Sequence, residues 1–176
     1  MSIHLRFLVT VAFTTLNFCL FAQQEATHKK NRIAPLVGYV FVPEQIEDGG
    51  SQARIIPTFG VDYERILSPK WAIGSFNDIE LSSYFISDSQ EEAGVLKREF
   101  VFITTVCAIY TLMDYWTVYG GAGGEFEAHK NFFVLRVGTE YEMPIRNEWD
   151  VTLGLSWDYK EVYNSIGFTI AFGKRF

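Results

Sequence analysis

The chain has 176 residues, the length of a single domain, is 48% apolar and 16% aromatic, and carries a formal net charge of −6 at pH 7. An acidic chain without a basic stripe cannot neutralise phosphates, which excludes a generic nucleic-acid binder. The two cysteines, Cys19 and Cys107, lie far apart, and Cys19 belongs to an N-terminal segment that we expect to be removed. One remaining cysteine excludes an intramolecular disulfide and a Cys-type metal cluster.

Residues 1–22 have the features of a secretory signal peptide. Arg6 gives a positive start, an apolar stretch follows, and Ala22 is a small residue at the expected cleavage point. Cleavage would change the net charge from −6 to −7, because Arg6 is lost. A retained membrane helix is the alternative, but the apolar stretch is shorter than the ~20 residues needed to span a bilayer. A lipoprotein anchored through Cys19 is a further alternative, although small residues do not precede that cysteine.

Residues 23–32 are polar and basic, and we interpret them as a short periplasmic linker before a domain at residues 33–176. The longest uncharged run in this domain, Phe100 to Met113, is 14 residues, too short for a membrane helix. Apolar and polar residues alternate instead, which indicates β-strands. We predict about eight strands from this pattern: 33–42, 54–67, 71–85, 98–112, 115–126, 132–143, 149–160 and 165–176.

The segment 149–160 shows the alternation most clearly. Its apolar face begins with Trp149, continues through Leu153 and ends with Trp157 and Tyr159. Aromatic residues at both ends of an apolar band are typical of the two interfaces of a membrane. The segment 165–176 likewise puts bulky apolar residues on one face and small or polar residues on the other.

The two faces of the predicted strands therefore have different chemistry. We expect the apolar face to contact lipid, as represented by Trp71, Trp149, Leu153, Trp157, Tyr159, Phe168 and Phe172. We expect the polar face to form a charge network in the lumen: Asp62, Asp78, Glu80, Glu125, Arg136, Glu140, Glu142, Asp150 and Asp158. Charges in a narrow lumen need partners, because desolvation is costly.

A soluble barrel of the lipocalin type has the same strand number, with an apolar interior and a polar exterior. Residue size favours the opposite arrangement here. An eight-stranded interior is just wide enough for side chains, so the many Phe, Tyr, Trp, Ile and Leu residues would overfill it. The fold class is thus predicted as all-β, an eight-stranded antiparallel up-and-down transmembrane β-barrel.

The connections between strands differ in length. Those near residues 68–70, 113–114 and 145–148 are short, whereas 44–53 and 87–97 are long and polar. Outer-membrane barrels have short periplasmic turns and longer external loops. We therefore expect loops 44–53 and 87–97 to face outward as a candidate surface for an extracellular ligand.

Three segments resemble the small outer-membrane β-barrel family of Gram-negative bacteria, of the OmpX-like or OmpA-barrel type. These are the glycine-rich stretch 120–126, the stretch 135–142 with inward Arg136 and Glu140, and the end of the chain from Gly167 to Phe176. The resemblance implies residence in the outer membrane, contact with its lipid, and insertion by the barrel assembly machinery, for which Phe176 would be the assembly signal. The segment 98–112 departs from the pattern, because it is apolar on both faces.

Candidate catalytic residues are scarce. His28 lies in the linker and His129 in a short loop, and no serine stands out as a partner for His129. The glycines at 120–124 are not followed by the helix and Lys-Ser/Thr pair of a phosphate-binding loop. We predict no catalytic, cofactor-binding or metal-binding residues, and interpret the acidic pairs as part of the network around Arg136.

These observations favour an outer-membrane barrel with a structural or surface-interaction role, no catalytic activity and a lumen plugged by charged side chains. A narrow pore for ions or small solutes is the first alternative. A lipid-modifying outer-membrane enzyme is the second.

Overall fold

The computed structural model describes residues 29–47, 50–87 and 95–176. The predicted signal peptide and residues 23–28 of the predicted linker lie outside these residues, as do positions 48–49 and 88–94 of the predicted loops. Ten strands are present: β1 Asn31–Glu47, β2 Gly50–Ile66, β3 Trp71–Glu80, β4 Ser83–Ser87, β5 Val95–Glu99, β6 Phe102–Met113, β7 Trp116–Phe126, β8 Phe132–Pro144, β9 Trp149–Lys160 and β10 Asn164–Arg175. Within the described residues, no helix has the length and apolar character to cross a membrane.

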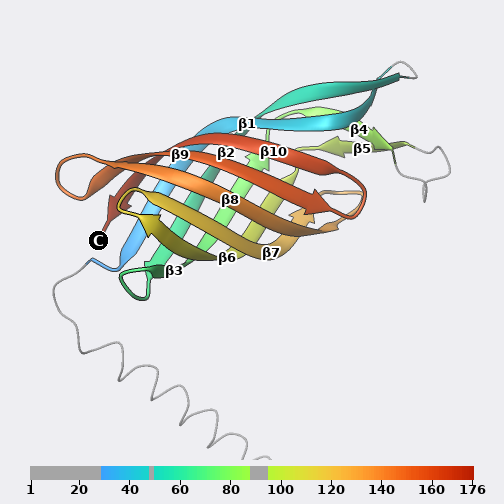
Figure 1. The fold of residues 1–176 in the computed structure, drawn as a ribbon. Helices are drawn as coiled ribbons and strands as arrows, with labels where there is room; N and C mark the ends of the chain where they lie inside the picture. The colour runs from blue at the N-terminus through green and yellow to red at the C-terminus, as the bar shows by residue number, and fades with distance from the viewer. Residues whose placement is uncertain (1–28, 48–49, 88–94) are drawn as a thin grey trace, which may run out of the picture.

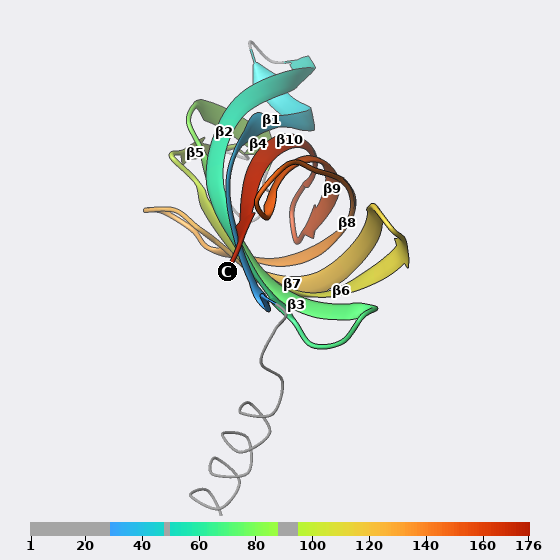
Figure 2. The same cartoon turned by 90° about the vertical axis from the view of Figure 1, so that its left-hand side faces the viewer.

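Eight of these strands form a closed antiparallel barrel. Each of β1, β2, β3 and β6 to β10 pairs with its neighbour, and β10 pairs with β1 to complete the ring. The closed ring is visible end-on in Figure 2, and the tilted strands are visible from the side in Figure 1. The predicted eight-stranded antiparallel barrel is confirmed.

The closing ladder between β1 and β10 is interrupted. Residues 32–33 pair with 174–175, and residues 36–41 pair with 166–171, but Ala34 and Pro35 have no partner on β10. Proline has no amide hydrogen to donate, so it cannot contribute a rung to a ladder. The ladder therefore consists of two separate blocks.

A sheet continues beyond one end of the barrel (Figure 1). The hairpin of β1 and β2 is 17 residues long on each side, so the described parts of the predicted loop 44–53 are strand. The hairpin of β4 and β5 joins this extension through the pairing of Gln45 with Ile86. The predicted strands 71–85 and 98–112 each divide in two, and Phe100, with a positive φ of 49°, lies at the break between β5 and β6.

The glycine-rich strand β7 lies unusually close to β6. A Cβ atom at Gly121 would collide with the backbone carbonyl of Val106, and one at Gly123 with that of Thr104. Only glycine fits these two positions, because any side chain would push the strands apart. The run of glycines, which would weaken an ordinary strand, therefore allows β6 and β7 to pack closely in the barrel wall.

Candidate functional site

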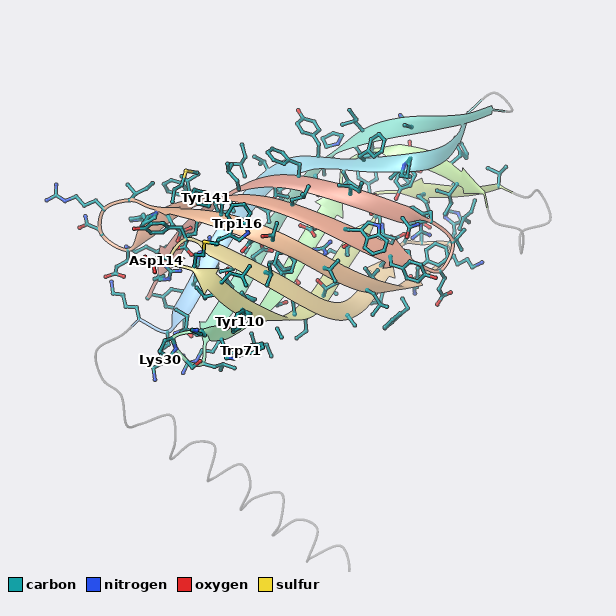
Figure 3. The ribbon with its side chains drawn as sticks, viewed as in Figure 1. Lys30, Trp71, Tyr110, Asp114, Trp116 and Tyr141 are labelled. Carbon is teal, nitrogen blue, oxygen red and sulfur yellow. The ribbon has the colours of Figure 1, made fainter. Side chains whose placement is uncertain are left out.

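The outer wall of the barrel is apolar. All seven residues predicted to contact lipid have exposed side chains on this wall: Trp71, Trp149, Leu153, Trp157, Tyr159, Phe168 and Phe172. Figure 3 shows Trp71, Tyr110, Trp116 and Tyr141 gathered toward the end of the barrel where β1 begins. Trp71 packs edge-on against Tyr110, and Trp116 against Tyr141. Such pairs form a partial aromatic girdle at one end of the apolar band.

The lumen is polar, and its first group of charges lies near the chain termini. Arg32 holds Asp150 through two hydrogen bonds of 3.0 and 2.6 Å, donates to Thr152 at 2.8 Å, and forms an ion pair with Glu64. Arg175 binds both carboxylate oxygens of Glu142, at 2.6 and 2.5 Å. β1 begins at Asn31, so Arg32 belongs to the barrel and not to the predicted linker.

Arg136 forms the second group, at the middle of the lumen. Its guanidinium donates two hydrogen bonds to Asp158, at 2.7 and 2.8 Å, and one to Asp78 at 2.6 Å. All three side chains are buried. The bidentate contact spans the paired strands β8 and β9, and the contact to Asp78 crosses the lumen to β3. Arg136 therefore ties opposite walls of the barrel together.

Glu125 is the centre of the third group, at the end that carries the extension. It accepts hydrogen bonds from Arg98 at 2.5 Å and from Tyr163 at 2.8 and 2.9 Å, and it pairs with Lys160 at 2.6 Å. The hydroxyls of Tyr84 and Tyr163 lie 2.7 Å apart.

Tyr84 also donates to Glu80 at 2.6 Å, which joins the β4–β5 hairpin to the charges of the lumen. Buried apolar side chains surround this group: Val40, Val42, Ile56, Ile86, Leu96, Val101, Ile103, Phe132 and Val134. We call this assembly of charged, tyrosine and apolar side chains the outer cap. It fills the lumen at the end that carries the extension.

The nine residues predicted for the lumen all face inward, and eight of them are buried, with Glu142 half-buried near the opening. They do not form one network, because seven of them are divided among the three groups above and two belong to none of the groups. The cations that hold the first and third groups were missed: Arg32, Arg98, Lys160 and Arg175. Lys160 and Arg175 could have been predicted, because they alternate in step with the inward-facing residues of their strands. Arg32 and Arg98 lie at or beyond the ends of the predicted strands, where alternation gives no information.

Two of the predicted residues, Asp62 and Glu140, stand apart from these groups. Asp62 is 3% exposed and Glu140 8% exposed. No described residue forms a hydrogen bond or an ion pair with either carboxylate. The Asp62 carboxylate nevertheless lies close enough to Asp78, Glu140 and Arg136 to interact electrostatically with their charges. Their charge is therefore not balanced by direct contacts.

The lumen opens at the end of the barrel where β1 begins and β10 ends. A cavity of about 310 Å³ occupies this mouth, lined by Glu64, Thr117, Glu142 and Arg175, with Asp114 and Tyr115 at the turn between β6 and β7. Phe176 lies nearby with an exposed side chain, and its backbone exchanges hydrogen bonds of 2.9 and 3.1 Å with Asn31. We call this cavity the mouth pocket.

His129 has its polar contacts within its own loop. Its Nδ1 lies 2.9 Å from Glu127, which also accepts a hydrogen bond from the His129 backbone. Partial burial opposes the effect, but these hydrogen bonds and the nearby Arg98 lower the pKa of the Glu127 carboxyl below its usual value. Among the described residues, no serine contacts His129, and no group of three or more His, Cys, Asp or Glu side chains is arranged to hold a metal ion.

A scan against protein-family models found no match, and a search of curated proteins found none. Among solved structures, the chain is similar to Ail, the attachment invasion locus protein of Yersinia pestis, with 13% identity, 84% of this chain and 99% of that chain covered, and a TM-score of 0.50. OprG of Pseudomonas aeruginosa aligns with 13% identity, coverages of 85% and 97%, and a TM-score of 0.47. Outer Membrane Protein W of E. coli aligns with 14% identity, 85% of this chain and 100% of that chain covered, and a TM-score of 0.44. At this identity, the likeness to Ail establishes a shared fold and leaves the role open.

Proposed function

We propose that this chain is an integral outer-membrane barrel with a closed lumen and a surface-interaction role. The observation that carries the proposal is the contrast between the two faces of the wall. The outward side chains are bulky and apolar, whereas the charged side chains face inward, where most of them are paired. A soluble barrel would need the reverse arrangement. Lipid of the outer membrane and the barrel assembly machinery are the partners this architecture requires.

The closed lumen is supported by the outer cap. Glu125, Arg98, Lys160 and Tyr163 are packed together with little or no exposure, and Arg136 bridges the lumen below them. An eight-stranded barrel has room for little beyond its own side chains. A continuous path for ions would need the cap to move.

We therefore expect no sustained conductance when the purified, refolded protein is inserted into planar bilayers at 1 M salt. A wide porin recorded in the same bilayers controls for insertion and detection. Stable, stepwise currents from this protein would support the narrow-pore alternative and contradict closure.

The surface-interaction role is supported by the sheet that extends beyond the barrel. β5 pairs only with β4, so one of its edges has no strand beside it among the described residues. Unpaired backbone groups on such an edge can accept an extended peptide. We propose that the extension lies outside the cell and contacts an extracellular protein ligand.

The orientation can be tested by thiol labelling of intact cells. Phe85 is exposed on β4 and Glu148 is exposed in the turn between β8 and β9, at opposite ends of the molecule. We expect a membrane-impermeant maleimide to label F85C in intact cells and E148C only after lysis. The native Cys107 is buried and should stay unlabelled in the folded protein. Labelling of E148C but not F85C in intact cells would reverse the orientation.

A lipid-modifying activity has less support, because the contacts of His129 are confined to Glu127. Mass spectrometry of lipid A after overexpression tests it directly. An unchanged lipid A profile is the result expected from a non-catalytic barrel.

A further inference from the structure

The charges buried inside the barrel do not balance. Among the described residues, eight carboxylates are buried and only four cationic side chains are buried with them. Six of the carboxylates have an ion pair or a hydrogen bond to another side chain: Glu64, Asp78, Glu80, Glu125, Asp150 and Asp158. The two that remain are Asp62 and Glu140. Burying an uncompensated carboxylate is costly, so these two positions need an explanation.

Two buried oxygen atoms in the part of the lumen next to the mouth pocket have no hydrogen-bond partner. Asp62 Oδ1 and Thr117 Oγ1 are both buried without a hydrogen-bond partner. Thr117 on β7 pairs directly with Glu140 on β8, so their side chains are neighbours on the inner wall. Asp62 is the next inward-facing residue after Glu64 on β2, about 7 Å further along the strand. Oxygen ligands therefore approach this part of the lumen from β2, β7 and β8.

The mouth pocket reaches Glu64, which precedes Asp62 on the inner face of β2 when counted from the mouth, and Thr117, which pairs with Glu140. Glu142 and Asp114 lie around its opening. Glu64 and Glu142 are paired with Arg32 and Arg175, so the remaining negative charge at the opening is that of Asp114, which favours cations over anions there. A cation that enters the mouth thus meets Glu140 and Asp62 after Glu142 and Glu64.

We propose that the lumen binds a partly hydrated divalent cation, Mg²⁺ or Ca²⁺, between Asp62 and Glu140, with the Thr117 hydroxyl as a further ligand. Hard divalent cations take oxygen ligands, and Mg²⁺ in particular is commonly held by one or two carboxylates while it keeps several waters. Water alone would satisfy the free lone pairs but would leave the excess negative charge unbalanced. This site is independent of the proposed surface role, because it lies at the opposite end of the barrel.

The test is urea unfolding of the refolded barrel in lipid-free detergent micelles, followed by tryptophan fluorescence. Metal is first removed with EDTA, and CaCl₂ or MgCl₂ is then titrated at constant ionic strength set with NaCl. A cation that binds only the folded state raises the unfolding midpoint in a saturable way. We expect this rise in the wild type, and we expect D62N and E140Q to lose it or to need at least tenfold more cation.

Glu161→Gln serves as the matched control, because it removes one carboxylate from an exposed position at the other end of the barrel. E161Q should respond to the cation like the wild type. Both lumen variants replace a carboxylate by an amide of the same shape, and unchanged heat-dependent gel migration will show that they fold. As a second readout, Tb³⁺ luminescence excited through tyrosine should appear in the wild type and be lost when Ca²⁺ is added, because the Tyr119 ring lies against Gly138, two residues from Glu140 on β8.

Two results would overturn the proposal. The first is a wild-type midpoint that shows no saturable response to divalent cations beyond that to NaCl, which would leave buried water or protonation to account for the free oxygens. The second is an undiminished response in both D62N and E140Q, which would place any bound cation elsewhere.

Discussion

Replacing Arg136 by alanine should lower the free energy of unfolding of the barrel by about 3–5 kcal/mol, the usual cost of removing one partner from a buried ion pair. The substitution leaves Asp158 and Asp78 buried without the guanidinium that donates hydrogen bonds to them and balances their charge. It also removes the link between β8 and the opposite wall. The measurement is urea unfolding in detergent micelles, with heat-dependent gel migration as a check on folding.

Arg146→Ala is the matched control for Arg136. Arg146 is exposed in the turn between β8 and β9, and its replacement should change the unfolding free energy by less than about 0.5 kcal/mol, as is usual for surface substitutions. If the R136A barrel unfolds within about 1 kcal/mol of the wild type, water fills the place of the guanidinium, and the lumen is not held together by this residue.

An arginine introduced on the lipid-facing wall should lower the free energy of unfolding, and the loss should grow with the depth of the position in the bilayer. Leu153 and Tyr159 share the outer face of β9, and Trp149 and Tyr159 mark the ends of its apolar band. The band is about 33 Å along the strand, or about 25 Å when the strand is tilted in a membrane. We expect L153R, near the middle, to cost about 2–4 kcal/mol, and Y159R, at the interface, about 0–1 kcal/mol.

The comparison requires unfolding in lipid vesicles, because the depth dependence comes from the bilayer. Both variants introduce the same side chain on the same face of the same strand, so strand propensity and charge are matched. Equal costs at the two positions would mean that the outer wall does not lie in hydrocarbon. That result would contradict the membrane barrel itself, whatever the lumen contains.

The barrel could be predicted from the sequence because the alternation that identifies each strand is a local property of that segment. In β9, side chains alternate strictly between large apolar and polar or small, and each such strand specifies its own inner and outer face. Strand ends were harder to predict. The segments 44–53 and 87–97 are polar and look like loops, yet their described parts pair as strands, because the hairpins β1–β2 and β4–β5 support each other.

Apart from Asp158, which was expected near Arg136, the ion-pair partners could not be predicted, because they depend on how the barrel closes. Arg32 and Asp150 are 118 positions apart, and they meet because β1 and β9 flank β10. The outer cap depends in the same way on Tyr163, which lies between β9 and β10, and on Tyr84, which lies on β4, beyond the break that divides the predicted strand 71–85. Alternation identifies which residues face inward, whereas the register of the closed ring decides which of them touch.

Pro35 lies in the pairing between β1 and β10 that closes the barrel. The β1–β10 ladder joins the two ends of the chain, so it can form only once the intervening strands have been brought into register. The interruption at Pro35 divides this ladder into a block of six pairings and a block of two. The Arg32–Asp150 contact lies beside the shorter block and joins β1 to β9 across β10, so a side-chain ion pair holds β1 in place where backbone pairings with β10 are missing.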